Sequence, residues 1–190
     1  MPLVVLPFYF VRHGETDWNR KHIAMGQTDI GLNETGLAQA RAVAKHLKGE
    51  PFKSIAASPL KRARQTAEII VTHTPTPITF FNELKEGCWG IKQGAPHDGW
   101  LERWREGEII EGAESFDEFI ERVRKGLNDI FQLPQPVLII SHGGVYIALH
   151  KILGFPFVDL ENCAAIFHRP PEHSHHPWFI CSFDGKEKTC

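Results

Sequence analysis

Short apolar segments alternate with amphipathic segments of helical period along most of this chain, and this pattern constrains the fold more than any other feature. Runs rich in β-branched and aromatic residues, each bounded by turn or helix signals, are typical of buried strands. They occupy residues 8–11, 54–57, 78–81, 137–140, 164–167 and 178–183. Strands that alternate with helices predict a mainly parallel sheet with helices on both faces.

The segments between these strands carry capping signals for helices. Asn33 is an N-cap residue before a segment with leucine and alanine at helical spacing over residues 34–48. Ser58 followed by Pro59 predicts the N-cap and the first residue of a second helix. The two remaining predictions are a helix opened by a capping box of Ser115 and Glu118 and a helix over 143–153 that ends at Gly154.

The chain length and this order of elements predict one domain over residues 1–190. We expect a three-layer α/β/α sandwich with a mainly parallel central sheet of about six strands, the last one or two of them antiparallel. The segment at about 83–112 interrupts the alternation and contains Trp89, Trp100 and Trp104. It is predicted to be a small cap inserted beside the edge of the sheet.

The charge balance excludes a generally basic protein. Lysine and arginine number 21 against 23 aspartates and glutamates, so no global field attracts nucleic acid or an anionic membrane. No segment approaches the length of a membrane span, and the four cysteines have no Cys-x-x-Cys spacing. We expect a cytoplasmic monomer or homodimer with neither a nucleic-acid partner nor a membrane partner.

Basic residues follow three of the predicted strands. Arg12 and His13 come directly after the first strand, Arg62 lies one turn into the helix after the second, and His142 follows the fourth. Ligands of open α/β sheets bind beyond the carboxyl ends of the strands, so these side chains are expected to meet. Two guanidiniums and two imidazoles, with a protonated histidine as a further charged donor, suit a compact polyanion such as a phosphoryl group.

Neutral imidazole can attack phosphorus, and nearby guanidiniums favour the neutral form, so His13 is the candidate nucleophile. The leaving alkoxide needs a proton. Glu86, which follows the third strand, is the candidate acid, because a carboxylic acid beside a phosphate dianion is disfavoured from ionising. The same residue in its ionised form can activate the water that hydrolyses phosphorylated His13. Glu83 and a plain solvated-loop role for Glu86 are the alternatives.

Six segments over most of the chain resemble the motifs of the histidine phosphatases, a family that includes the cofactor-dependent phosphoglycerate mutases. The resemblance implies that His13 is phosphorylated, that Arg12, Arg62 and His142 complete the phosphate pocket, and that Glu86 donates the proton. The mechanism requires no metal or other cofactor, because arginines neutralise the charge. The segments are RHGETDWN at 12–19, GQTDIGL at 26–32, SPLKRARQT at 58–66, LKEGCWG at 84–90, GAES at 112–115 and SHGG at 141–144.

Two further polar residues of the first motif region, Asn19 and Gln27, are candidates for substrate contacts, although both are equally compatible with a role in turns. A histidine cluster suggests metal binding, but it lies among prolines without a carboxylate partner, so a hairpin between the last two strands is the better interpretation. Its members are His168, His173, His175 and His176.

Hydrolysis is favoured over phosphoglycerate mutase-type transfer. A mutase must keep water from the phosphohistidine until a second substrate arrives, which requires a lid. Only about twenty residues separate Trp89 from Gly112, and the chain ends a few residues after the last predicted strand. We therefore expect a phosphatase that acts on a small phosphorylated metabolite. A mutase and a non-catalytic protein that binds a phosphorylated ligand are the alternatives.

Overall fold

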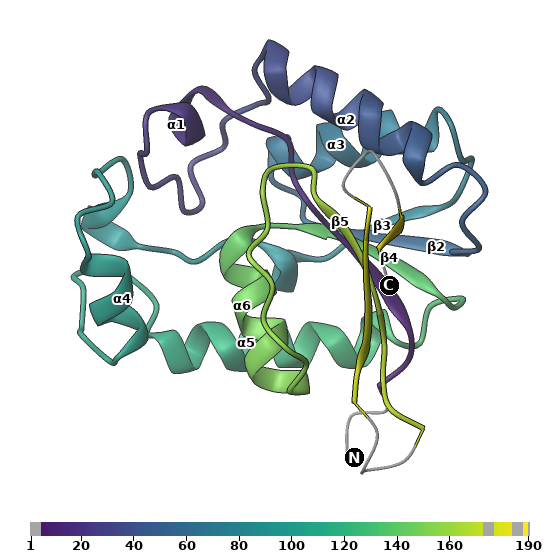
Figure 1. Ribbon diagram of the computed structural model, residues 1–190. Coiled ribbons are helices and arrows are strands. Elements are labelled where there is room, and N and C mark those ends of the chain that lie inside the picture. The colour runs from purple at the N-terminus through teal and green to yellow at the C-terminus, as the bar shows by residue number, and fades with distance from the viewer. Residues whose placement is uncertain (1–4, 173–176, 184–187, 190) are drawn as a thin grey trace.

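The computed structural model describes residues 5–172, 177–183 and 188–189, and these form one twisted sheet with helices on both faces (Figure 1). The strand order is β3-β2-β4-β1-β5-β6-β7. The first four strands in this order pair in parallel and the remaining three antiparallel, which confirms the predicted α/β/α sandwich but gives three antiparallel strands where one or two were expected. The strands are β1 (Phe8–Arg12), β2 (Ser54–Ala57), β3 (Ile78–Phe80), β4 (Val137–Ser141), β5 (Ala165–Arg169), β6 (Phe179–Phe183) and β7 (Lys188–Thr189).

Alternate residues of β1 point into two separate cores. Phe8 and Phe10 belong to the core under α5 (Phe116–Ile130) and α6 (Gly143–Leu153). Tyr9 and Val11 belong to the core under α2 (Glu34–His46) and α3 (Lys61–Val71). Strand side chains alternate between faces, so a strand that is buried along its length must be covered on both sides. The two pairs of helices are visible above and below the sheet in Figure 1.

The predicted start of α3 is wrong by two residues. The helix begins at Lys61 with Leu60 as N-cap, rather than at Pro59 after Ser58. The Ser58 hydroxyl accepts the Leu60 N–H at 3.3 Å and is also hydrogen-bonded to His142. Its side chain therefore belongs to a contact between β2 and the loop after β4, and the chain turns before the helix starts.

The segment at 83–112 contains the short helix α4 (Trp100–Arg105) and the single 3₁₀ turn Gly90–Lys92. A second 3₁₀ turn, Asn82–Leu84, overlaps the start of the segment. Trp89, Trp100 and Trp104 are buried and pack edge to face. This segment lies beside α1 (Asp17–Arg20), a single turn that the sequence pattern did not predict (Figure 1). Residues 83–112 thus bring three tryptophans to the end of the sheet at which β1 and β4 finish.

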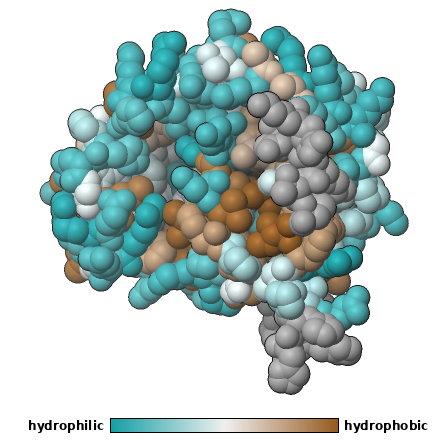
Figure 2. All heavy atoms as spheres, in the orientation of Figure 1, coloured by the Kyte–Doolittle hydropathy of each residue, from teal (hydrophilic) through white to brown (hydrophobic). Residues whose placement is uncertain are grey.

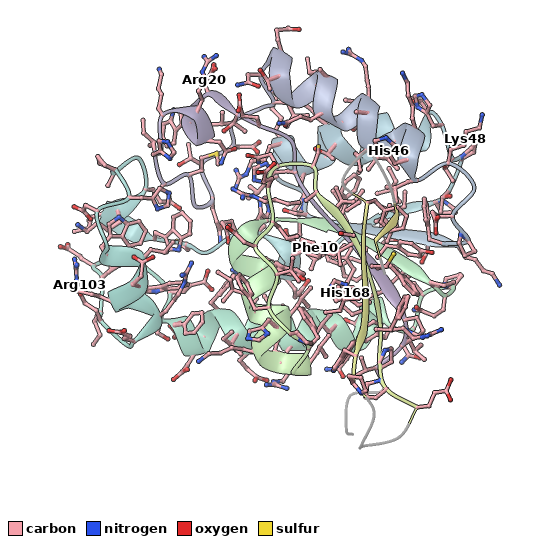
Figure 3. All side chains as sticks on the ribbon, in the orientation of Figure 1. Phe10, Arg20, His46, Lys48, Arg103 and His168 are labelled. Carbon is pink, nitrogen blue, oxygen red and sulfur yellow. The ribbon has the colours of Figure 1, made fainter. Side chains whose placement is uncertain are left out.

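His168 is a core residue of β5 and is fully buried (Figure 3). Its ring stacks on Phe8 at a centroid distance of 4.6 Å, and its Nε2 is 3.0 Å from the Tyr146 hydroxyl. Burial lowers the pKa of His168 to about 3. His173, His175 and His176 lie outside the described residues, within which no group of three metal-ligating side chains occurs.

No helix in the described part of the chain is both long and apolar enough to cross a membrane.

Two glycines permit the close crossing that places His13. A Cβ atom on Gly14 would lie 2.6 Å from the Gly36 carbonyl oxygen, and one on Gly36 would overlap the backbone of Glu15. Because main-chain atoms face main-chain atoms at this crossing, neither segment can move aside at a small cost in free energy. We expect Gly36→Ala to lower the free energy of unfolding by about 1–3 kcal/mol in urea denaturation. Thr35→Ala at the exposed neighbouring position should change it by less than about 0.5 kcal/mol; equal stabilities would contradict the close crossing.

Candidate active site

His13 stands directly after β1 with its side chain 2% exposed. Its Nδ1 is 2.7 Å from the Gly14 carbonyl, an acceptor, so Nδ1 carries the proton and Nε2 presents a lone pair. The main chain is fixed as well, because His13 N–H donates to the Ser141 carbonyl and the Asn162 amide donates to the His13 carbonyl, both at 2.9 Å. The imidazole is therefore held in the tautomer in which Nε2 is unprotonated and carries the lone pair that an attack requires.

Arg62 of α3 is fully buried and lies between the two histidines. Its Nε is 3.3 Å from His13 Nε2 and 3.2 Å from His142 Nδ1, so one N–H is shared between both rings. The two terminal nitrogens donate to the carbonyls of Thr28 at 3.0 Å and Gly26 at 2.8 Å. The guanidinium is thus locked in orientation by the loop that follows α1.

His142 is the N-cap residue of α6 and is fully buried. Because its Nδ1 accepts from Arg62, its Nε2 carries the proton and donates to Ser58 Oγ at 2.8 Å. Burial and then the positive charge of Arg62 hold the pKa of His142 well below its usual range. The sequence predicted a protonated, charged donor here, and that prediction is wrong for this structure, in which the ring is neutral.

Arg12 ends β1 and is directed toward the same point. Its Nη1 donates to the Leu160 carbonyl at 2.6 Å, while its Nε is buried without a hydrogen-bond partner in the described structure. Burial lowers the pKa of Arg12, and the Glu86 and Asp159 carboxylates oppose that shift. Arg12 is half-buried and lines the cavity, so its guanidinium can offer charged donors to a phosphoryl oxygen.

Glu86 is 7% exposed and comes to the site from the loop after β3. Its Oε1 accepts the Gly87 N–H at 3.0 Å and its Oε2 accepts the Gly144 N–H, in the first turn of α6, at 3.1 Å. Glu83, the alternative acid, instead packs against Gly126 of α5. The structure therefore brings Glu86, and not Glu83, to the basic cluster.

Arg12, His13, Arg62 and Glu86 line one cavity of about 220 Å³, whereas His142 is not among the lining residues and contacts the site through Arg62. Asn19 is also in its wall, although its Oδ1 accepts the Thr16 N–H at 3.1 Å as part of a capping box. Gln27 lies behind the wall, where its amide donates to the Glu86 carbonyl at 3.2 Å. The substrate-binding roles predicted for Asn19 and Gln27 stay predictions, and the structure gives Gln27 a contact with the loop of the acid.

The outer wall of the cavity is largely aromatic and apolar, and no sequence signal pointed to the part contributed by the loop after α6. On the face seen in Figure 2, hydrophobic residues gather near the centre, close to the segment that leads from α6 to β5. The outer lining residues are Ile23, Trp89, His97, Leu101, Trp104, Arg105, Tyr146, Ile147, Phe157 and Asp159.

The local charges favour an anion. Burial lowers the pKa of Arg62 to about 10, with the Glu86 and Asp29 carboxylates opposing the shift, so both guanidiniums remain charged at neutral pH. The first turn of α6 adds N–H groups and the positive end of a helix dipole. Charged donors, a neutral imidazole with an unprotonated Nε2, and a carboxyl group facing one cavity are the set needed for phosphoryl transfer to histidine.

We expect His13 to remain neutral at pH values at which an ordinary histidine is protonated. Burial, and then the charges of Arg62 and Arg12, hold the pKa of His13 well below the usual 6.5, whereas the Gly14 hydrogen bond only partly opposes them. In ¹⁵N NMR spectra His13 Nε2, assigned by comparison with His13→Ala, should keep the shift of a neutral ring at pH 6. A protonation midpoint at or above 6.5 would contradict the buried, charge-repelled environment.

The comparisons agree with this geometry. The model of the histidine phosphatase superfamily (branch 1) matches residues 8–166. A Bacillus subtilis protein named as an uncharacterised phosphatase, PhoE, is 39% identical over 145 residues, which are 75% of this chain and 73% of that protein. A probable phosphoglycerate mutase of Photorhabdus laumondii, GpmB, is 34% identical over 92% of this chain and 88% of that protein. A mycobacterial glucosyl-3-phosphoglycerate phosphatase in complex with VO₃ superposes with a TM-score of 0.78, at 25% identity over 95% of this chain and 99% of that chain.

Proposed function

The chain belongs to branch 1 of the histidine phosphatase superfamily, and from that premise we propose that it hydrolyses a small phosphomonoester through a phosphohistidine at His13. One observation carries the proposal. His13 Nε2 lies 3.3 Å from the Arg62 guanidinium and lines the same cavity as Arg12 and the Glu86 carboxyl group. Nucleophile, anion site and proton donor thus face one volume.

In the first half-reaction, His13 Nε2 attacks phosphorus and the bond from phosphorus to the ester oxygen breaks. Glu86 gives its proton to the leaving oxygen, so the product is a neutral alcohol and Glu86 becomes a carboxylate. Arg12 and Arg62 stabilise the charge on the transferring phosphoryl oxygens. The Gly14 carbonyl accepts the Nδ1–H of the ring at 2.7 Å and stabilises the positive charge that develops there.

In the second half-reaction, water attacks the phosphorus of phosphorylated His13. The Glu86 carboxylate takes a proton from this water, the phosphorus–nitrogen bond breaks, and inorganic phosphate leaves. The free imidazole returns with its proton on Nδ1. The two guanidiniums supply the charge neutralisation that a metal ion supplies in other phosphatases, so the proposed reaction involves no metal.

The outer wall of the cavity favours hydrolysis of an ester whose alcohol carries no second phosphate. Leu101, Trp104, Ile147 and Phe157 line this wall, and the charges of Arg105 and Asp159 beside them are of opposite sign. A bisphosphate would need further cations there, since each unpaired anionic group taken from water loses solvation. This wall therefore argues against the mutase alternative, in which a bisphosphorylated intermediate must be held.

An assay with 4-nitrophenyl phosphate tests the proposal. We expect release of inorganic phosphate and, on acid-free quenching, an acid-labile phosphoenzyme. If no phosphoenzyme forms and no inorganic phosphate is released, the proposal is overturned in favour of a non-catalytic protein that binds a phosphorylated ligand. Isomerisation of 3-phosphoglycerate, with and without 2,3-bisphosphoglycerate, should be slower than hydrolysis; isomerisation as fast as hydrolysis would establish the mutase instead.

Glu86→Gln should slow the reaction in proportion to how poor the leaving group is. The amide has a single acceptor oxygen, so it keeps only one of the two hydrogen bonds from the Gly87 and Gly144 N–H groups, and it cannot donate a proton to an alkoxide. We expect kcat/KM to fall by about 10²–10⁴-fold for an alkyl phosphate and much less for 4-nitrophenyl phosphate, whose leaving group needs little protonation. Equal losses on both esters would contradict the role of Glu86 as acid. Glu83→Gln is the matched control and should retain activity on both.

A further inference from the structure

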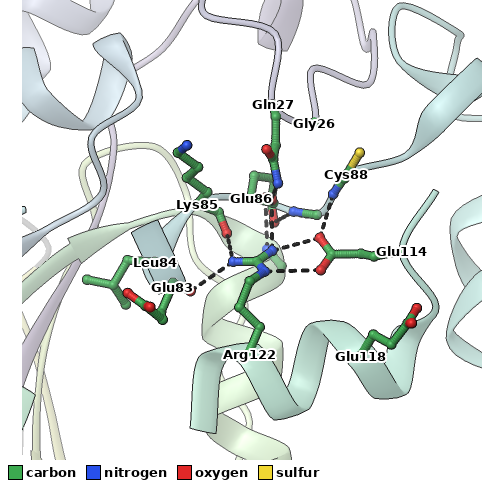
Figure 4. A network of polar contacts seen from close by, with 12 residues as sticks. Gly26, Gln27, Glu83, Leu84, Lys85, Glu86, Cys88, Glu114, Glu118 and Arg122 are labelled. Atoms are coloured by element: carbon green, nitrogen blue, oxygen red, sulfur yellow. Dashed lines mark hydrogen bonds and ion pairs between the residues drawn. The ribbon is translucent and has the colours of Figure 1, made fainter. Parts of the chain in front are cut away.

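The loop that carries Glu86 is tied to α5 by one side chain, Arg122 (Figure 4). Arg122 Nη1 donates to the carbonyls of Glu83 at 2.9 Å and Lys85 at 3.0 Å, and Nη2 donates to the carbonyl of Glu86 at 3.2 Å. The guanidinium thus contacts three carbonyls within four consecutive residues. The main chain curves around it.

Glu114 completes this arrangement from the other side (Figure 4). Its two oxygens pair with Arg122 Nη2 at 2.7 Å and Nε at 3.0 Å, a bidentate geometry, and its Oε1 also accepts the Cys88 N–H at 2.7 Å. The side chains are 23% and 16% exposed, so solvent screens the pair only in part. Arg122 and Glu114, which we call the loop clamp, therefore contact the backbone on both sides of Glu86.

The loop clamp and α6 fix different parts of the same residue. The clamp binds the carbonyl of Glu86, whereas Gly144 of α6 donates to its carboxylate. A proton donor must lie within hydrogen-bond reach of the leaving oxygen, and an error of about 1 Å in placement costs about 10²-fold in rate. Neither Arg122 nor Glu114 is among the residues that line the cavity, so neither is in position to bind the phosphoryl group.

We infer that Arg122 and Glu114 are positioning residues that hold the Glu86 loop at the distance at which the acid reaches the leaving oxygen. This inference rests on the proposed function. It assigns the clamp to one chemical event, protonation of the leaving group, and separates it from phosphate binding, which belongs to Arg12 and Arg62. A clamp that serves only stability would affect all substrates alike.

The test is the leaving-group dependence of kcat/KM, which reports the step that breaks the ester. We expect Arg122→Gln to lower kcat/KM by about 10–100-fold for an alkyl phosphate and by less than about 3-fold for 4-nitrophenyl phosphate. The inhibition constant of inorganic phosphate should change by less than about 2-fold, because the residues of the anion site are not altered. Arg124→Gln is the matched control on α5, since the Arg124 side chain is 43% exposed and pairs with Glu121 at 3.3 Å.

Combining substitutions sharpens the test. If the clamp acts through the acid, Arg122→Gln in a Glu86→Gln background should cause no further leaving-group-dependent loss. Glu114→Gln keeps the side-chain shape and should show the same dependence in weaker form, which preserves the test if Arg122→Gln does not fold. Arg122→Lys should restore little, since one ammonium cannot reproduce the planar fork.

Three results would overturn the inference: equal losses on alkyl and 4-nitrophenyl phosphates, additive losses in the double variant, or weakened phosphate inhibition equal to the loss in kcat/KM. These differ from a failure of the proposed function, in which the unsubstituted protein itself forms no phosphoenzyme and releases no phosphate. Unfolding midpoints of every variant, measured in parallel, identify losses that follow from unfolding.

Discussion

Replacement of His13 by alanine is expected to abolish turnover, with kcat/KM lowered by about 10⁴-fold or more. The proposed reaction forms a bond between phosphorus and His13 Nε2, and His142, the neighbouring imidazole, cannot substitute. His142 Nε2 carries a proton that it donates to Ser58, and His142 is not among the residues that line the cavity, whereas His13 is. Steady-state hydrolysis of 4-nitrophenyl phosphate measures the loss of turnover, and trapping of the phosphoenzyme measures the loss of the covalent intermediate.

The same variant should still bind a phosphate-like anion. Arg12 and Arg62 remain charged at neutral pH and keep their donors, so orthovanadate or inorganic phosphate is expected to raise the unfolding temperature of His13→Ala as it does for the unsubstituted protein. His46→Ala, at an exposed position of α2, is the matched control with full activity. Substantial hydrolysis by His13→Ala would mean that another group, or water directly, attacks phosphorus.

Periodicity and strand ends were sufficient to predict where the site forms. The alternation of elements predicted parallel strands, and parallel strands place their carboxyl ends together, so Arg12 and His142 met as expected after β1 and β4, which pair at Arg12 and Ser141. Arg62 followed for the same reason, since β2 pairs with β4. This part of the site is a consequence of topology, which the hydrophobic pattern determines.

The parts that the sequence did not predict depend on contacts between distant segments. Nothing local distinguishes Arg122 from a solvated arginine of α5, because its carbonyl partners lie 36 to 39 residues away in the chain. Ser58 has the sequence of a helix cap, yet its hydroxyl bonds His142, 84 residues away. Capping propensities describe local competition, and a buried tertiary partner outweighs them.

The charge state of His142 could not be predicted from the sequence either. Counting two arginines and two histidines predicted a site with more than two positive charges. Enclosure changes this result, because burial and the neighbouring guanidiniums hold the pKa values of both His13 and His142 well below their usual range. The positive charge that attracts the phosphoryl group therefore comes from Arg12 and Arg62, and the histidines contribute a nucleophile and a hydrogen-bonding ring.

Replacement of Arg62 is the second substitution for which we expect a large loss of activity. Arg62→Met is expected to lower kcat/KM by about 10³–10⁵-fold, the range seen when an arginine that stabilises a transferring phosphoryl group is missing. Arg62→Lys should recover little of this, because a single ammonium cannot donate to both imidazoles, to the carbonyls of Gly26 and Thr28, and to the phosphoryl oxygens. Kinetics with 4-nitrophenyl phosphate measure both variants, and Arg64→Met, at the exposed position two residues along α3, is the matched control.

The stability of Arg62→Met separates binding from folding. Arg62 is fully buried, and its replacement by methionine leaves the Gly26 and Thr28 carbonyls without the donors that pair with them, which lowers the free energy of unfolding. We therefore expect Arg62→Met to unfold at a lower temperature than the unsubstituted protein while still folding, and to lose the thermal shift with orthovanadate. Retention of that shift would show that the anion is held elsewhere, and loss of the fold would show that Arg62 serves structure first. The expected pattern, a folded protein without anion binding, would mean that Arg62 supplies the charge of the anion site in addition to its hydrogen bonds to the loop after α1.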